Sequence, residues 1–195
     1  KIYIFNKSSN VPLWSYSGGS VKSVDISADG KYLVLGSGND NIYLFDRLSN
    51  NPLWSYTTGD QSPVVSISSD GNYIGVGSGL SDSDNNIFLF GKNSNTPIWS
   101  FSTNDNERIK SISISQDGKY VTAGAVDDKI YLFGKDSNSP IWSFDCGSDI
   151  QEVSISADGS YLTSWCSVSD ELLLFKNDEV SHPSVIPYGP RSGSE

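Results

Sequence analysis

Apolar and polar residues alternate along short stretches of the chain, and each stretch ends at a turn signal. Residues 21–27 read Val-Lys-Ser-Val-Asp-Ile-Ser, which is the period-2 pattern of a strand with one buried face. An Asp-Gly pair follows as a tight-turn signal, and three further apolar stretches come at residues 32–36, 41–45 and 53–56. No stretch has the period of a helix of useful length. The pattern predicts an all-β unit of four short strands.

This unit recurs along the chain. The sequence Pro-(Leu/Ile)-Trp-Ser-(Tyr/Phe) occurs four times, with its Trp at positions 14, 54, 99 and 142, which gives spacings of 40, 45 and 43 residues. A period of about 40–45 residues with four strands per unit is typical of a β-propeller blade. One blade cannot bury both of its faces alone, so we expect recurring aromatic residues to pack between blades. These are Trp14, Trp54, Trp99, Trp142, Phe45, Phe90 and Phe133.

The expected fold class is all-β, with about four four-stranded antiparallel β-propeller blades. We expect repeat units at residues 21–57, 64–102, 109–145 and 151–176, after a partial unit at 1–17. Residues 177–195 are expected to form a partly disordered tail, in which 183–187 is a poor candidate for a fourth strand. Because a strand is left over and the ends expose blade faces, we expect the blades to belong to a larger or shared ring. The alternative is a closed four-blade ring with the N-terminal strands as a clasp.

Two related families resemble these repeats. Residues 23–37, followed by 42–46, resemble a WD-repeat blade, and residues 45–59 are similar to the Trp-containing repeat of PQQ-type (quinoprotein-like) propellers. The resemblance covers residues 1–176 and implies a propeller, a fold that serves many tasks. WD repeats usually carry Trp-Asp after the third strand, where this chain has pairs such as Phe90-Gly91, and no His occupies the Gly-His position. The buried polar tetrad of that family therefore cannot form, and aromatic packing should hold the blades together.

Length variation is concentrated on one edge of the predicted blades. The step from the Phe of the third strand to the Trp of the fourth is nine residues in every repeat: 5 to 14, 45 to 54, 90 to 99 and 133 to 142. The two spans that hold the other loops vary from 15 to 18 and from 16 to 20 residues. Antiparallel strand order places these variable loops on one face, and variable loops on a rigid scaffold are common binding sites. The expected partner-binding face comprises Asp60, Asp82, Asp84, Asp105, Glu107, Asp127, Asp128 and Asp149. Solvated turn residues that keep the protein soluble are the alternative.

The formal net charge of −10 limits the classes of partner. A chain this acidic repels phosphate backbones, and we therefore expect no nucleic-acid partner. No run of about 18 apolar residues predicts a membrane span. We expect a protein or cationic partner, and a second copy or a larger propeller could complete the ring. The Ser/Asn/Asp-rich composition and the absence of Met favour a secreted or cell-surface location.

Candidate chemistry is sparse. Asp82, Asp84 and Asn86 resemble the start of an Asp-x-Asp-x-Asn calcium loop without its following Gly and final Glu, so calcium competes with a plain Asx-rich loop. Cys146 and Cys166 are the only cysteines, and a disulfide and two free thiols are both open. A single histidine removes His-based triads, and no nucleophile elbow or phosphate-binding loop is present. We expect no enzyme activity.

The sequence therefore predicts a non-catalytic interaction or scaffold module that presents acidic, variable loops to a protein or cationic partner. Two alternatives stay open: a secreted PQQ-like or ligand-binding propeller, and a structural cell-surface repeat domain. A ligand site in the central channel would need convergent Arg, Trp or metal ligands on the first strands. Those strands offer Lys22, Asp25, Lys110 and Glu152, which form no pattern.

Overall fold

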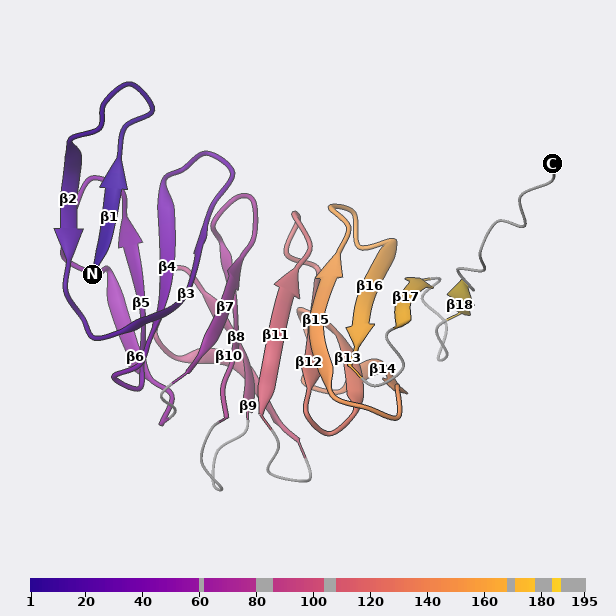
Figure 1. Cartoon of the computed structure of the whole chain (residues 1–195). Helices are drawn as coiled ribbons and strands as arrows, with labels where there is room; N and C mark the ends of the chain where they lie inside the picture. The colour runs from indigo at the N-terminus through magenta and orange to yellow at the C-terminus, as the bar shows by residue number, and fades with distance from the viewer. Residues whose placement is uncertain (60–61, 80–85, 104–107, 168–170, 178–183, 187–195) are drawn as a thin grey trace.

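The computed structural model describes residues 1–59, 62–79, 86–103, 108–167, 171–177 and 184–186. Within these ranges the protein is all-β, as the sequence predicts, and no helix that could cross a membrane is found there. The strands form one two-stranded hairpin and four four-stranded antiparallel sheets. The sheets follow one another in an arc, with the N-terminal hairpin at one end and the most C-terminal sheet at the other (Figure 1).

Each four-stranded sheet is one blade, whose strands we call a, b, c and d in chain order. The N-terminal hairpin consists of β1 (Ile2–Phe5) and β2 (Pro12–Tyr16). Blade 1 comprises β3 (Val21–Ile26), β4 (Tyr32–Ser37), β5 (Asn41–Asp46) and β6 (Trp54–Thr57), and blade 2 comprises β7 (Val64–Ile67), β8 (Tyr73–Gly77), β9 (Asn86–Gly91) and β10 (Pro97–Ser102). Blade 3 comprises β11 (Ile109–Ile114), β12 (Tyr120–Ala125), β13 (Lys129–Gly134) and β14 (Pro140–Asp145), and blade 4 comprises β15 (Ile150–Ile155), β16 (Tyr161–Cys166), β17 (Glu171–Lys176) and β18 (Ser184–Ile186).

The two ends of the arc differ from each other. At the C-terminal end β18 pairs with β17, so the poor candidate for a fourth strand does complete blade 4. At the N-terminal end β1 and β2 form a sheet of their own, which packs on blade 1 through Ile4, Trp14 and neighbouring residues. In the described residues this hairpin does not pair with blade 4, so the N-terminal clasp of a closed four-blade ring is not formed.

The turn from strand a to strand b has the same Ser-x-Asp-Gly structure in every blade. In blade 1 the Ser27 hydroxyl donates to the Asp29 carboxylate at 2.7 Å and accepts the N–H of Tyr32 at 3.0 Å. Gly30 has a φ of +66°, a left-handed conformation that glycine adopts without steric cost. The serines at positions 68, 115 and 156 make the same pair of bonds. The Asp-Gly pair is therefore part of a four-residue turn motif, Ser-x-Asp-Gly.

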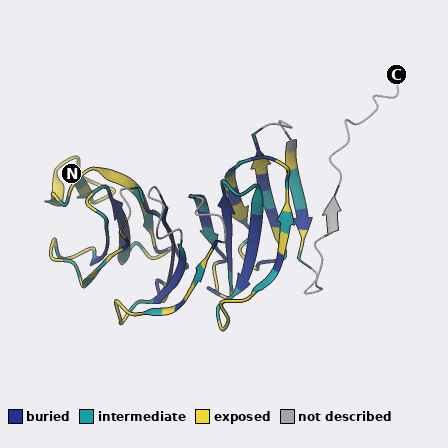
Figure 2. Ribbon diagram, turned by 90° about the horizontal axis from the view of Figure 1, so that it is seen from below, coloured by how far each residue is buried: buried dark blue, intermediate teal, exposed yellow. Residues whose placement is uncertain are grey.

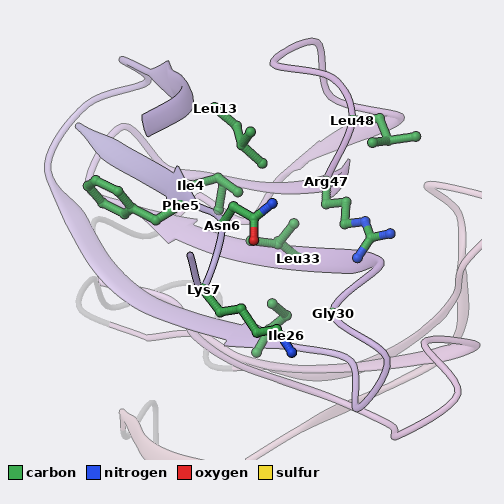
Figure 3. A pocket seen from close by; sticks show the side chains of 10 residues that line it. All are labelled: Ile4, Phe5, Asn6, Lys7, Leu13, Ile26, Gly30, Leu33, Arg47 and Leu48. Atoms are coloured by element: carbon green, nitrogen blue, oxygen red, sulfur yellow. The ribbon is translucent and has the colours of Figure 1, made fainter. Parts of the chain in front are cut away.

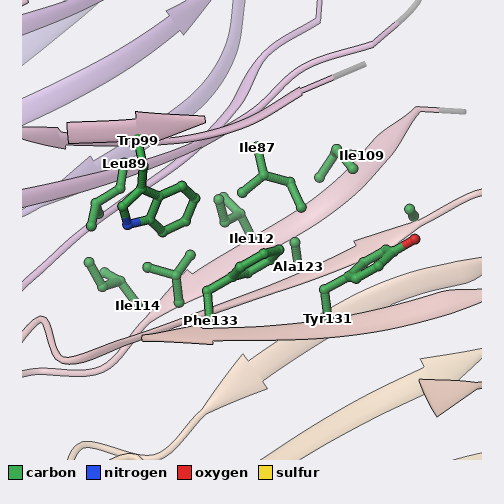
Figure 4. Close-up of a cluster of buried hydrophobic side chains, with 11 residues drawn as sticks. Ile87, Leu89, Trp99, Ile109, Ile112, Ile114, Ala123, Tyr131 and Phe133 are labelled. Atoms are coloured by element: carbon green, nitrogen blue, oxygen red, sulfur yellow. The ribbon is translucent and has the colours of Figure 1, made fainter. Parts of the chain in front are cut away.

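The hydrophobic core lies between blades. Figure 4 shows one such layer, in which Leu89 and Trp99 of blade 2 meet Ile112 and Phe133 of blade 3. The Phe that ends the apolar run of strand c is fully buried in blades 1 to 4, at positions 45, 90, 133 and 175. Figure 2 shows buried stretches along the strands of the blades and the largely exposed N-terminal hairpin at the end of the arc. Each blade therefore depends on its neighbours to cover its faces.

A disulfide joins blades 3 and 4. Cys146 follows β14 and Cys166 ends β16, and their Cα atoms lie 6.5 Å apart. The equivalent positions around blade 1 are Gly18 and Ser37, where the serine hydroxyl donates to the glycine carbonyl at 2.5 Å. The repeat thus brings these two backbone positions together in any case, and in blade 4 they carry cysteines.

Candidate functional site

Every blade has two edges with different roles. The turn edge carries the a–b and c–d turns, and the loop edge carries the b–c loops and the connections between blades (Figure 1). All length variation in the repeats falls on spans that contain loop-edge segments. The loop edge is therefore the first place to look for a binding site.

Five of the eight acidic residues of the expected partner-binding face lie outside the described residues. These are Asp60, Asp82, Asp84, Asp105 and Glu107. The structure places the other three, Asp127, Asp128 and Asp149, on the loop edge of blades 3 and 4.

Asp127 and Asp128 shape the b–c loop of blade 3. The Asp127 side chain is only 2% exposed, and its carboxylate accepts hydrogen bonds from the Tyr131 hydroxyl and from the N–H of Lys129, the latter at 3.1 Å. Asp128 has a φ of 64°, and Asp40 at the same place in blade 1 has a φ of 69°. Asp tolerates this left-handed conformation better than most residues. Asp127 therefore holds the loop together and offers little charge to solvent.

Asp149 combines a structural contact with access to solvent. Its carboxylate forms an ion pair with Lys110 at 3.0 Å, which links the connection before blade 4 to strand a of blade 3. The Asp149 side chain is nevertheless 42% exposed. An ion pair this exposed contributes little stability, about 0–1 kcal/mol. Asp149 is thus an acidic group of the loop edge that a partner can reach.

The expected calcium site falls mostly outside the described residues. Of its three ligands only Asn86 is described, at the start of β9, where its side-chain oxygen accepts a hydrogen bond from the Ser102 hydroxyl of β10. No group of three His, Cys, Asp or Glu side chains suited to a metal occurs in the part of the chain that the structure describes. Calcium binding by Asp82 and Asp84 stays a prediction.

The polar side chains of the first strands connect neighbouring blades. The Asp25 carboxylate of blade 1 accepts the N–H of Ile67 in blade 2 at 2.9 Å. The Ser23 hydroxyl of blade 1 accepts the N–H of Val65 at 3.2 Å. Ser111 of blade 3 accepts a backbone N–H of blade 4 at 3.1 Å in the same way. These side chains satisfy backbone donors that would otherwise lack partners, so they are not free to converge on a ligand in the channel.

The recurring Trp and Phe residues form one contact that repeats from blade to blade. The Trp of strand d lies against the Phe of strand c in the following blade. Ring centroids are 5.7 Å apart for Trp14–Phe45, 5.5 Å for Trp54–Phe90, 5.2 Å for Trp99–Phe133 and 5.6 Å for Trp142–Phe175. The indole N–H of the first three donates to a backbone carbonyl in the next c–d turn, that of Arg47, Lys92 or Lys135, at 2.7, 2.7 and 2.9 Å. Each Trp therefore fills an interface between blades, and Trp14, Trp54 and Trp99 also fix the next turn.

Carboxylates on the turn edge are held in their own turns. Hydrogen bonds from the Ser160 hydroxyl and N–H, and from the Ser156 hydroxyl, lower the pKa of Asp158 to about 2. The pKa of Asp29 is lowered in the same way by the Ser27 hydroxyl and the Lys31 N–H. Bonds to the charged form of a carboxyl favour that form. These aspartates are therefore ionised at neutral pH and already bonded, which suits a structural role.

Some residues that matter were not identified from the sequence pattern. The serine two positions before each Asp-Gly aspartate, and the strand-a residues Ser23 and Asp25, carry the turns and the inter-blade bonds. An alignment of the repeats would have shown the serine recurring at positions 27, 68, 115 and 156. Nothing in the repeat marks Asp25, because the other blades have Ser at its position.

Comparison with known families agrees with this geometry. Two segments, residues 10–46 and 95–133, match the family model described as WD domain, G-beta repeat. The first match begins just before β2 and ends with β5, and the second begins just before β10 and reaches into β13, so each takes strand d of one unit and strands a to c of the next. A comparison with curated proteins gave no match. The similarity to PQQ-type repeats stays a prediction. These two segments are similar to WD repeats, and the four-stranded sheets of the chain are β-propeller blades.

Proposed function

We propose that the chain is a non-catalytic interaction module that presents its loop edge to a protein partner. Propellers with WD-type repeats commonly serve as protein-interaction scaffolds. The observation that carries the proposal is the contrast between the two edges. The c–d step is nine residues in every repeat, as in 45 to 54, while the spans with loop-edge segments vary from 15 to 20 residues. Variation confined to one edge of a rigid scaffold is typical of a recognition surface.

The negative charge of the chain and of its loop edge supports a partner that binds this edge through a cationic segment. The net charge is −10, and the loop edge holds an acidic side chain with access to solvent in Asp149. The acidic residues at positions 60, 82, 84, 105 and 107 lie outside the described residues and fall in the variable spans of the sequence. A surface of one sign raises the rate of encounter with the opposite charge and repels nucleic acid. A basic protein segment therefore fits this edge better than a phosphate backbone does.

The polar groups of the first strands support a role without catalysis. Asp25 and Ser111 already accept backbone N–H groups from the neighbouring blade. A catalytic or ligand site needs polar groups that converge on an open position. Asp25 and Ser111 use theirs to join blades, and the two open blade faces fit an incomplete ring.

Binding of a Lys/Arg-rich peptide library to two charge variants, one on each edge of the blades, tests the proposal. One variant neutralises the loop edge with Asp128→Asn and Asp149→Asn together with the acidic residues at 82, 84 and 105. The control neutralises the c–d turns with Asp46→Asn and Asp136→Asn. We expect selected peptides to bind the protein in a salt-dependent manner, to lose affinity for the loop-edge variant, and to retain it for the control. Equal binding to both variants would contradict the proposal.

A further inference from the structure

The N-terminal end of the arc leaves the inner part of blade 1 uncovered. Val24 and Ile26 of β3 are 60% and 53% exposed, while Val65 and Ile67 at the same places in blade 2 are both 6% exposed. A cavity of about 520 Å³ opens beside Ile26, and it is also lined by Ile4, Phe5, Leu13 and Leu33 among others (Figure 3). The β1–β2 hairpin occupies the positions of strands c and d of a preceding blade. The cavity lies where strands a and b of that blade would pack. We call this surface the N-terminal face.

The three internal interfaces show what such a face binds. In each of them, the Gly of one a–b turn receives the ring of a Tyr from strand b of the preceding blade. A Cβ on Gly71, Gly118 or Gly159 would overlap Tyr32, Tyr73 or Tyr120 respectively. Gly30 is the equivalent residue on the N-terminal face, and there a Cβ would meet only a methyl group of Ile26, at 3.9 Å. The place of a Tyr ring is thus open above Gly30.

Backbone hydrogen bonds between the a–b turns have the same direction throughout. The N–H of Ala28 donates to Ser69 at 3.0 Å, that of Ser69 to Gln116 at 3.0 Å, and that of Gln116 to Ala157 at 2.9 Å. Ala28 is exposed and takes part in this series through its N–H, so its carbonyl is where the N–H of a preceding turn would bind. The N-terminal face therefore matches a turn whose N–H points along the arc, as in each of the other blades.

Strand b must also carry a glycine four residues after its Tyr. Gly36, Gly77 and Gly124 occupy this position in blades 1 to 3. A Cβ on any of them would overlap the next blade, at Pro63 just before β7, at Ile109 of β11 or at Ile150 of β15. Blade 4 departs from the rule, because Trp165 stands there and is 44% exposed. An indole would fill the space in which the next strand a lies.

We propose that the N-terminal face binds the a–b hairpin of a further blade whose second strand has the pattern Tyr-x-x-x-Gly. That hairpin would pair with the free edge of β1, cover Val24 and Ile26, and place its Tyr over Gly30. The β15–β16 hairpin, from the same copy or a second one, is excluded because it presents Trp165 where the interface requires glycine. The two open ends of the chain are therefore not partners for each other.

A fusion tests this proposal directly. Residues 109–128 hold a hairpin with the required pattern, and residue 128 precedes Lys129 as a fused residue would precede Lys1. We expect this segment, attached before Lys1, to slow amide hydrogen exchange in β1 and β3 about tenfold or more. The matched control is the same fusion with Gly124→Trp in the added segment, which should give no protection. Trp165 shows that a Trp at this place is compatible with a hairpin of its own.

A second pair of fusions, built from the hairpin of blade 4, repeats the test with a different hairpin. Residues 150–170, attached before Lys1 with Cys166→Ser in the added copy, should leave β1 and β3 unprotected, and Trp165→Gly in that copy should restore protection. Unchanged exchange in β8 and β12 shows that each fusion keeps the fold of the array. The free peptide of residues 109–128, added to the unmodified chain, should protect the same amides. No protection by the glycine hairpins, or equal protection by the tryptophan hairpins, would overturn the proposal.

Discussion

Truncation of one interface Phe should separate the contribution of the inter-blade contact from that of the sheet. Phe133 is fully buried, and its ring centroid lies 5.2 Å from Trp99 and 5.1 Å from Phe101 of the preceding blade. Phe133→Ala removes this ring and leaves a cavity between two blades. Such a change costs about 3–5 kcal/mol of the free energy of unfolding.

The repeat supplies a matched control in Phe5. It occupies the same position in β1, opposite Pro12 as Phe133 is opposite Pro140, but it is 53% exposed and no described Trp lies against it. Phe5→Ala should therefore cost about 1 kcal/mol or less. Urea unfolding followed by circular dichroism measures both losses, and hydrogen exchange assigns them to blades, because repeat arrays can unfold in parts. Equal losses for the two variants would refute the view that inter-blade aromatic contacts hold the array together.

Three further predictions concern the disulfide, acid stability and calcium. Replacing Cys146 and Cys166 by Ser should lower the free energy of unfolding by about 3 kcal/mol, because the disulfide closes a loop with a sequence separation of 20 residues. A urea midpoint equal to that of the oxidised parent would contradict this prediction. The pKa of Asp158 is lowered from 3.8 to about 2 in the folded chain, so its contribution to the free energy of unfolding is complete above the unfolded pKa and is lost as the pH falls toward 2. Asp158→Asn should therefore flatten the dependence of the free energy of unfolding on pH between about pH 5 and 2. An unchanged dependence would show that the turn does not hold this carboxylate. Calorimetry with millimolar calcium decides between a calcium site and a plain Asx-rich loop: heat that Asp82→Ala and Asp84→Ala abolish would establish the site, and the absence of heat with the parent chain would rule it out.

The sequence was sufficient to predict the blades because their strand pattern and aromatic residues recur. Trp99 and Phe133 occupy fixed places in the repeat, so an inter-blade role followed from recurrence alone. The direction of the contact did not follow. Only the structure shows that Trp99 lies against the next blade and donates to the Lys135 carbonyl. A carbonyl partner leaves no mark in the sequence, because every residue has one.

The candidate site was less accessible to sequence reasoning than the fold. Asp127 and Asp149 look alike as loop carboxylates, yet one is enclosed by Tyr131 and the other stays open to solvent beside Lys110. Burial depends on neighbours that come from other strands and blades, so residue type alone cannot separate the two. The bond between Cys146 and Cys166 likewise depends on the contact of two blades.

Departures from the repeat are as informative as the repeat itself. Trp165 replaces the glycine of Gly36, Gly77 and Gly124, and Tyr161 and Leu172 beside it are exposed. The face of blade 4 that carries Trp165 and Leu172 therefore differs from every internal face of blades 1 to 3. The N-terminal face, in contrast, keeps the features of an internal interface.

The most direct test of the open arc is a distance measured between its two ends. Spin labels at Val24→Cys and Leu172→Cys would report on the N-terminal face and on the exposed face of blade 4, whose parent side chains are 60% and 58% exposed. Joined faces would bring the labels to a separation on the order of 10 Å, the spacing of packed sheets. We expect no such short distance within one molecule or between two. A dominant short distance would contradict an arc with two unlike, unjoined ends.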